Sequence, residues 1–407
     1  MTVKSYTVTV FVLTALLLVG VLGLTLTVDP YGVHDAAPVA GFNQRKPETD
    51  THVRLYKDRA LDRAAPVTVL LGNSRVDAGF DPASDTWPAD MRPVFNAGIP
   101  GTATEYSLRV LRRALRLSTV KTVIVGLDVL DFRVDPAETD ATAPPPADWE
   151  VGDGGPLTRA RRFMETSLSL KAVIDSLLTI AAQGNPHAAH RAPTGYNTMA
   201  EYGGFVALEG HHAIFLQRNL ENFANYRRGP KAVARADGTD SAEWRAVKDI
   251  IALAGEKGVN LVFVLFPYHA DVLEGFRLAG LDPAFEDFKR RLTALAAASG
   301  RDIPVWDFSG HSALTDEPVP PPGDTRTHMA GYWEAGHFKA ALGDAMVKVM
   351  TGAPGARPGI LAGFGVRLTP ATLEAHLADL RARRQAYAQA HPEAVDRAER
   401  QFARTAR

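Results

Sequence analysis

The sequence predicts an α/β protein, built on a doubly wound parallel sheet of about five strands and preceded by one transmembrane helix. Short runs of β-branched and aliphatic residues alternate with stretches of helical periodicity, which is typical of a buried parallel sheet. The chain has 407 residues, of which 46% are hydrophobic, enough to bury a large core. An uncharged, apolar run near the N-terminus stands apart from this pattern.

That run, residues 6–28, is long enough to cross a membrane, because roughly 20 helical residues span a bilayer core. It has no clear small-residue cleavage site before Asp29, which favours an uncleaved anchor over a removed signal peptide. Lys4 precedes the run, Asp29 and Asp35 follow it, and the next basic residue is Arg45, so the N-terminus should be cytoplasmic. We therefore expect a single-pass inner-membrane protein with a periplasmic, extracytoplasmic domain.

Residues 29–65 are polar and proline-bearing and predict a membrane-proximal stalk with a short helix at 51–63. The α/β domain should follow at 66–352. Its alternation breaks at about 134–240, which we interpret as an insertion containing a proline-rich loop at 134–156 and a helical stretch at 157–182. The remaining residues, 353–407, predict a charged helical tail. We expect strands at 67–71, 93–96, 120–127, 259–266 and 303–306, and helices at 105–117, 241–257, 283–299 and 340–350.

Composition excludes several classes of function. The 45 basic and 46 acidic side chains give a net charge of -1, which argues against a nucleic-acid partner. The chain has no cysteine and so no disulfide or thiol nucleophile. The histidine pairs at 187 and 190 and at 211 and 212 lack a third ligand at metal-binding spacing. No dinucleotide fingerprint or phosphate loop is present, so we expect neither metal nor cofactor.

Ligands of doubly wound sheets bind outside the carboxyl ends of the strands. Those ends carry Ser74, Gly98, Asp128 and His269. Ser74 directly follows the first strand, where the next helix offers backbone N–H groups to a developing oxyanion. A serine is a weak nucleophile without a base, and His337, just before the last helix of the domain, is the best candidate.

Glu334 stands three residues before His337 and can accept a hydrogen bond from its Nδ1, which would orient the imidazole toward the serine. A serine in a strand-to-helix turn is common, and most such serines are turn or cap residues. The combination of Ser74 and the Glu-x-x-His pair at opposite ends of one α/β domain is what indicates a catalytic site.

Over residues 67–350 the chain resembles the SGNH or GDSL-like superfamily of esterases and polysaccharide O-acetyltransferases. The resemblance implies a three-layer, flavodoxin-like fold, with Ser74 as nucleophile, His337 as base and Glu334 as orienting acid. It also implies that the Gly98 N–H joins that of Ser74 in an oxyanion hole. Three blocks carry the resemblance: Leu-Gly-Asn-Ser-Arg at 71–75, Phe-Asn-Ala-Gly at 95–98 and Glu-x-x-His at 334–337.

The chain departs from this family pattern in three places. Asn73 and Glu334 stand where the family usually has Asp, and the third block, Gly-x-Asn-Asp, is missing. Asp128 ends the corresponding strand, but a carboxylate donates no hydrogen bond unless it is protonated. Asn96 is a candidate for the missing oxyanion donor.

Two neighbouring side chains have alternative interpretations. Arg75 could bind an anionic substrate group, or pair with Asp77 or Asp81, and we favour the structural role. His269 could contact substrate, or it could be a loop histidine whose ring nitrogens are hydrogen-bonded within the protein, and the sequence favours neither. Asp131, with Asp128, could cap or brace the site.

The resemblance implies a serine acyl-transfer enzyme, an O-acyltransferase or esterase, acting on an envelope or exported polysaccharide through an acyl-Ser74 intermediate. Its substrate would be a glycan or an acylated small molecule, and a membrane protein would supply the acyl group. The missing third block motivates an alternative, a non-catalytic SGNH-like domain that binds a glycan or a partner in an export complex. A third possibility, an unrelated α/β binding module, requires the Glu-x-x-His pair to be coincidental.

Overall fold

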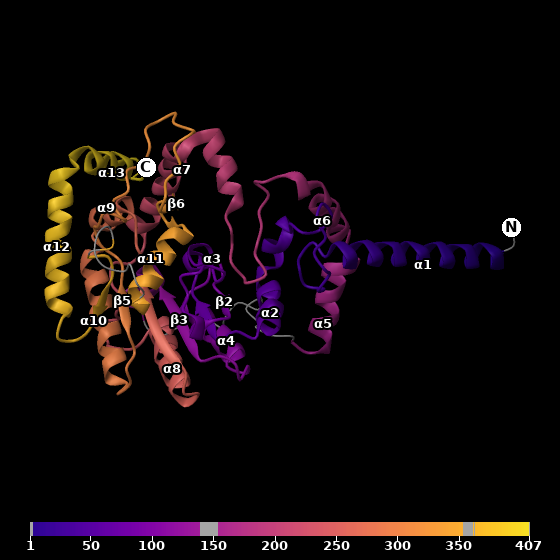
Figure 1. The fold of residues 1–407 in the computed structure, drawn as a ribbon, viewed down its shortest axis with the longest axis horizontal. Coiled ribbons are helices and arrows are strands. Elements are labelled where there is room, and N and C mark those ends of the chain that lie inside the picture. Colours follow the sequence, from indigo (N-terminus) through magenta and orange to yellow (C-terminus); the bar gives the residue numbers. More distant parts are fainter. Residues whose placement is uncertain (1–2, 139–153, 353–360, 362, 407) are drawn as a thin grey trace. The chain divides into compact units, whose positions relative to one another are not determined.

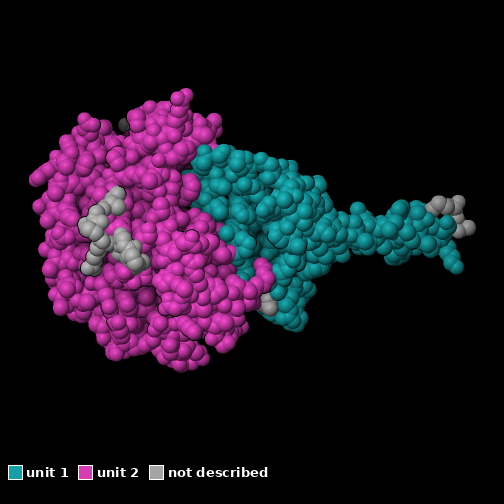
Figure 2. All heavy atoms as spheres, viewed as in Figure 1, with its two compact units in different colours: residues 1–60, 147–193, 197–203 teal, residues 61–146, 194–196, 204–407 magenta. Residues whose placement is uncertain are grey.

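The computed structural model describes residues 3–138, 154–352, 361 and 363–406. Most of the predicted loop at 134–156 and the start of the tail at 353–360 lie outside these residues. The chain forms two compact units (Figure 2). The first contains residues 1–60, 147–193 and 197–203, and the second contains 61–146, 194–196 and 204–407.

A six-stranded, mostly parallel sheet forms the centre of the second unit (Figure 1). The strand order is β2-β1-β3-β4-β5-β8, and only β8, at one edge, is antiparallel. The predicted α/β class and parallel sheet are confirmed, whereas β8 was not predicted. The strands are β1 (Thr68–Leu71), β2 (Val94–Asn96), β3 (Thr122–Leu127), β4 (Asn260–Leu265), β5 (Val305–Asp307) and β8 (Val366–Leu368).

Helices cover both faces of this sheet. Crossover connections between parallel strands are right-handed, and this strand order therefore places α4, α8 and α10 on one face, where α4 packs against α8. The other face carries α3, which lies beside α11. Phe132, Trp244 and Phe288 form a buried aromatic cluster, with ring centroids 4.6–5.4 Å apart. The helices are α3 (Ser74–Gly79), α4 (Thr104–Ala114), α8 (Ala242–Glu256), α9 (Ala270–Ala279), α10 (Asp282–Ala298) and α11 (Ala340–Thr351).

The order of the parallel strands, 2-1-3-4-5, creates a switch point between β1 and β3, where the chain first leaves toward β2 and then returns on the other side. Ligands of doubly wound sheets bind at such a point. A two-stranded hairpin of β6 (Tyr332–Glu334) and β7 (His337–Phe338) follows the last parallel strand. Short 3-10 turns complete the unit: η2 (Ala89–Met91) and η3 (Val129–Phe132).

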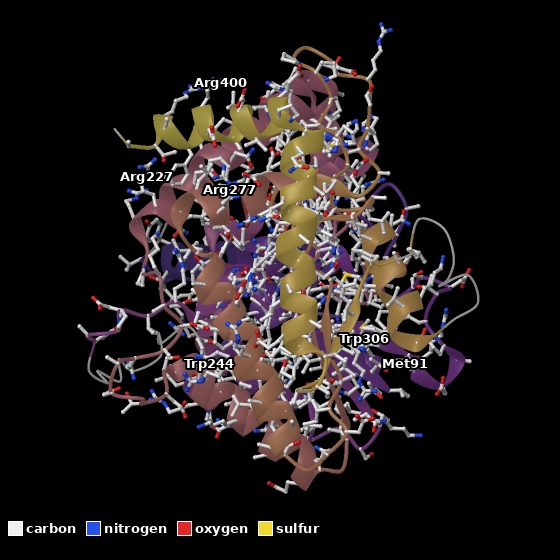
Figure 3. All side chains as sticks on the ribbon, turned by 90° about the vertical axis from the view of Figure 1, so that its left-hand side faces the viewer. Met91, Arg227, Trp244, Arg277, Trp306 and Arg400 are labelled. Atoms are coloured by element: carbon white, nitrogen blue, oxygen red, sulfur yellow. The ribbon has the colours of Figure 1, made fainter. Side chains whose placement is uncertain are left out.

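The tail forms two helices, α12 (Leu373–Ala390) and α13 (Pro392–Arg404). Figure 3 shows α12 running along the side of the second unit that faces the viewer. Its buried His376 contacts Asp307 at the end of β5, with 2.9 Å between Nε2 and Oδ2. The Lys289 ammonium lies 2.9 Å from the same carboxylate oxygen. The tail is therefore joined to the sheet through a buried ionic cluster, which the charge pattern alone did not predict.

The long helix α7 (Ala200–Arg228) bends at Gly210, whose φ is 75°. A side chain there would place its Cβ 2.3 Å from the carbonyl oxygen of Asp324, so both the backbone conformation and the close approach require glycine. The sequence pattern of the insertion did not predict this helix.

The first unit begins with α1 (Val3–Val28), which is long and apolar enough to span a membrane. Its C-terminal turns pack against η5 (Met164–Leu168), a π-helical turn, and α6 (Leu170–Ala181). The Thr25 hydroxyl donates to the Ser167 carbonyl at 2.8 Å. The other elements are η1 (Pro47–His52), α2 (Val53–Ala64), which continues into the second unit, α5 (Pro156–Phe163) and η6 (Ala182–Gly184).

The sequence predicted one helical stretch at 157–182, but the structure divides it into separate elements. Ser169 has an extended backbone (φ -85°, ψ 151°), and its hydroxyl accepts the N–H of Ala172 at 3.0 Å, which starts α6 as a new helix. Residues 29–60 belong to the same compact unit: the Tyr31 hydroxyl donates to the Asp175 carboxylate at 2.5 Å. The predicted membrane-proximal stalk is therefore packed against part of the insertion.

Candidate active site

Ser74 is the first residue of α3, directly after the tight turn that follows β1. Gly72 in this turn has φ 149°, and a Cβ there would lie 2.9 Å from the carbonyl oxygen of Gly126. The Asn73 side chain caps the helix by accepting the Arg75 N–H at 3.0 Å. The backbone N–H of Ser74 stands at the helix N-terminus, where no intrahelical carbonyl is available to it.

The hairpin β6–β7 brings His337 and Glu334 to this serine. The His337 Nε2 lies 2.8 Å from the Ser74 Oγ, although the two residues are 263 positions apart. The His337 Nδ1 is hydrogen-bonded to the Glu334 carboxylate, whose second oxygen accepts the Gly336 N–H at 2.7 Å. The structure thus places the three residues in one continuous hydrogen-bonded chain.

Burial alone would raise the pKa of Glu334, whose side chain is only 2% exposed, but its electrostatic attraction and hydrogen bond to His337 more than offset this effect. The net effect is a lowered pKa, so the carboxylate is ionised at neutral pH. An ionised acceptor selects the tautomer with hydrogen on Nδ1 and leaves the Nε2 lone pair toward Ser74. The His337 side chain is 25% exposed, so the imidazole is not sealed inside the protein.

Two glycines allow close packing on α3, one of the hairpin and the other of α11. A Cβ on Gly79 would lie 2.1 Å from the Phe338 ring, and a Cβ on Gly343 of α11 would lie 1.9 Å from the Gly79 carbonyl oxygen. The Tyr332 hydroxyl also donates to the Pro267 carbonyl at 2.9 Å, which ties the hairpin to the end of β4. Sequence reasoning missed these positions, because a glycine in a helix gives no signal of what packs against it.

Asn96 and Gly98 adjoin the serine helix. The Asn96 side chain is fully buried, and its amide donates to the carbonyls of Val76 at 2.7 Å and Phe80 at 2.9 Å. Its Oδ1 accepts the Gly98 N–H at 3.1 Å. An amide has only two hydrogens, so Asn96 braces α3 and does not serve as the substitute oxyanion donor that the sequence suggested.

Arg75 pairs with Asp128 at the end of β3, and not with Asp77 or Asp81 as the sequence suggested. The Tyr268 hydroxyl donates to the same carboxylate at 2.8 Å. Both members of the ion pair are largely buried, with side-chain exposures of 11% and 2%. This geometry favours the structural interpretation of Arg75, in which it braces the switch point, over the substrate-binding one.

Two further residues near the strand ends have well-defined surroundings. His269 caps α9: its Nδ1 accepts the Asp271 N–H at 3.1 Å, and its Nε2 lies 2.9 Å from the Glu317 carbonyl oxygen. Both ring nitrogens are thus engaged within the protein, as the loop interpretation of this histidine expects. Burial and the nearby Asp128 charge raise the pKa of Asp131 to about 8, so this carboxyl is mostly protonated at neutral pH.

Comparison with known proteins finds no matching protein-family model, no similar curated protein and no similar solved structure. The residues that the structure describes include no group of three or more potential ligands that could hold a metal ion. His211, one of the paired histidines in the sequence, instead accepts the Met329 N–H at its Nε2 (3.1 Å).

That geometry contains the elements of an activated nucleophile: a hydroxyl, a base within hydrogen-bond distance of it, and an ionised carboxylate on the far side of the base. Such a chain can move the hydroxyl proton to the imidazole as the oxygen attacks an electrophile. The buried carboxylate then stabilises the imidazolium that forms.

Proposed function

We propose that this protein is an SGNH-type serine acyl-transfer enzyme, an O-acyltransferase or esterase, with Ser74 as nucleophile, His337 as base and Glu334 as orienting acid. The observation that supports it most is the 2.8 Å contact between the His337 Nε2 and the Ser74 Oγ, with Glu334 on the opposite nitrogen. A general base must come within about 3 Å of the proton that it removes.

In the first half-reaction the Ser74 Oγ attacks the acyl carbonyl carbon while its proton passes to the His337 Nε2. The oxygen of the tetrahedral intermediate accepts from the backbone N–H of Ser74 at the start of α3. The ester bond then breaks, His337 returns the proton to the leaving alkoxide, and the acyl group remains on Ser74. In the second half-reaction a sugar hydroxyl or water gives its proton to His337 as its oxygen attacks the acyl carbonyl carbon. The bond to the Ser74 Oγ then breaks, and His337 returns the proton to that oxygen.

The substrate class and the location are proposed on the same basis. With α1 crossing the inner membrane and the rest of the chain periplasmic, the site would act on an envelope or exported polysaccharide. An acylated small molecule or a membrane protein that carries the acyl group would be the donor. No cofactor enters these steps, because the serine, the imidazole and the carboxylate account for every proton and bond.

One observation favours a second candidate, a non-catalytic SGNH-like domain that binds a glycan or a partner protein. The Gly98 N–H, the expected second donor of the oxyanion hole, is already hydrogen-bonded to the Asn96 Oδ1. The oxygen of the tetrahedral intermediate would have to compete with Asn96 Oδ1 for the Gly98 N–H, or accept a hydrogen bond from the Ser74 N–H alone. Loss of one such donor typically costs about 10²–10³-fold in rate.

The test is hydrolysis of 4-nitrophenyl acetate, and acetyl transfer from it to polysaccharide fragments, by the full chain in lipid nanodiscs. We expect Ser74→Ala to reduce the rate by at least about 10³-fold, while Ser118→Ala, an exposed serine after α4, leaves the rate unchanged. Equal rates for these two variants would contradict the proposal. A folded wild-type protein that binds the fragments but turns over no ester would favour the second candidate.

A further inference from the structure

The first unit contains a helix whose apolar side faces outward. In α6 the inward positions hold small or polar residues, Ala172, Asp175, Ser176 and Thr179. The outward positions hold Leu170 (75% exposed), Ile174 (47%), Leu177 (55%) and Leu178 (50%). A helix on the surface of a soluble protein has the opposite arrangement, and a continuous exposed apolar face marks a surface that something covers.

The neighbouring segment has the same character. Leu157 on α5 is 84% exposed, Phe163 is 42% exposed and Met164 in η5 is 54% exposed. Arg159 and Arg161 on α5 are also exposed. Apolar side chains interspersed with arginines are typical of a helix that lies in the plane of a membrane interface, with its cations among anionic headgroups.

The dimensions of α1 place this surface at the membrane boundary. Residues 3–20 of α1, 18 residues, are exposed along their whole length, and burial begins at residues 21–28. At 1.5 Å per residue the free part measures about 27 Å, slightly less than the hydrocarbon core of about 30 Å. If α1 spans a bilayer, the boundary falls within its next turns, and those are the turns that α6 and η5 cover.

We infer that α5, η5 and α6 form an interfacial platform, with the outward residues Leu170, Ile174, Leu177 and Leu178 inserted among the lipid headgroups and upper acyl chains. The platform and α1 belong to one compact unit, joined by the hydrogen bond from Thr25 to Ser167, so the same bilayer is within reach of both. At the membrane boundary, the platform would cover the last turns of α1 and shield them from water. This inference depends on α1 spanning a membrane and is independent of the serine chemistry.

The chain has no cysteine, so single cysteines can carry a bimane fluorophore without background labelling. We would label Ile174→Cys and Leu177→Cys in the full chain, one molecule per nanodisc. Leu16→Cys, 63% exposed on α1, serves as the membrane control, and Glu256→Cys, 67% exposed at the end of α8, serves as the aqueous control. All four positions are exposed, so the labels disturb no packed core.

Brominated lipids should reduce the fluorescence at Ile174 and Leu177 by about two-fold or more, because side chains of interfacial helices lie about 5–10 Å deep. Aqueous iodide should quench these two labels far less than the label at Glu256. Strong iodide quenching without lipid quenching would overturn the inference. Protection from both quenchers would also overturn it, since a protein partner would then cover the surface.

Discussion

Replacing Glu334 by glutamine isolates the orienting role of this carboxylate. The amide oxygen can still accept the Gly336 N–H, as one carboxylate oxygen does at 2.7 Å, so the hairpin should keep its shape. The amide nitrogen, however, can only donate to the His337 Nδ1. The imidazole must then carry its hydrogen on Nε2, pointing at Ser74, and it can no longer accept the serine proton.

The expected loss follows from this change of tautomer. A triad whose acid becomes an amide loses about 10⁴-fold in kcat, which corresponds to about 5.4 kcal/mol of transition-state stabilisation. The assay is the rate of 4-nitrophenyl acetate hydrolysis by the full chain. Glu221→Gln on α7 is the matched control, because it removes a charge that acts on Glu334 without touching the hydrogen-bonded chain. A Glu334→Gln variant that is folded and within about three-fold of the wild-type rate would show that Glu334 does not set the tautomer of His337.

Three further predictions concern stability, measured by chemical unfolding of the full chain. Gly98→Ala would place a Cβ 2.8 Å from a backbone nitrogen of α3 and should cost about 1–3 kcal/mol, whereas Gly184→Ala, with open space around it, should stay within about 0.5 kcal/mol. Asp128→Asn leaves the buried Arg75 charge uncompensated and should cost about 3–5 kcal/mol, and Arg75→Met in the same chain should recover part of it. Burial lowers the pKa of His211 to about 4, so the unfolded chain, with a histidine pKa of about 6.5, binds more protons between pH 4 and 6.5. The free energy of unfolding should fall as the pH drops through that window, and it should fall less steeply in His211→Gln. Equal slopes against pH in the two proteins would contradict the lowered pKa of His211.

The sheet was predictable because its strands carry their own signal. The run at 67–71 is β-branched and aliphatic and is bounded by Gly72, and β1 (Thr68–Leu71) occupies it. The edge strand β8 has only three residues, one of them an exposed arginine, and therefore no recognisable pattern. The break at Ser169 depends on a single hydroxyl cap inside an apolar stretch, which periodicity does not reveal.

For the candidate site, the sequence indicated which residues meet but not how they are held. Ser74, His337 and Glu334 were predictable because a serine after a strand and a histidine before the last helix are local patterns. The role of Asn96 was not, since its partners are backbone carbonyls of α3 that no pattern identifies. The pairing of Arg75 with Asp128 was missed because it joins two strand ends 53 positions apart.

Ser74 should react as an activated nucleophile when the full chain in nanodiscs is exposed to a fluorophosphonate probe and the adduct is located by mass spectrometry. We expect an adduct on Ser74 that is lost in His337→Ala and retained in His328→Ala. A folded protein that forms no adduct on Ser74, or forms it equally well in His337→Ala, would show that Ser74 is not activated by His337.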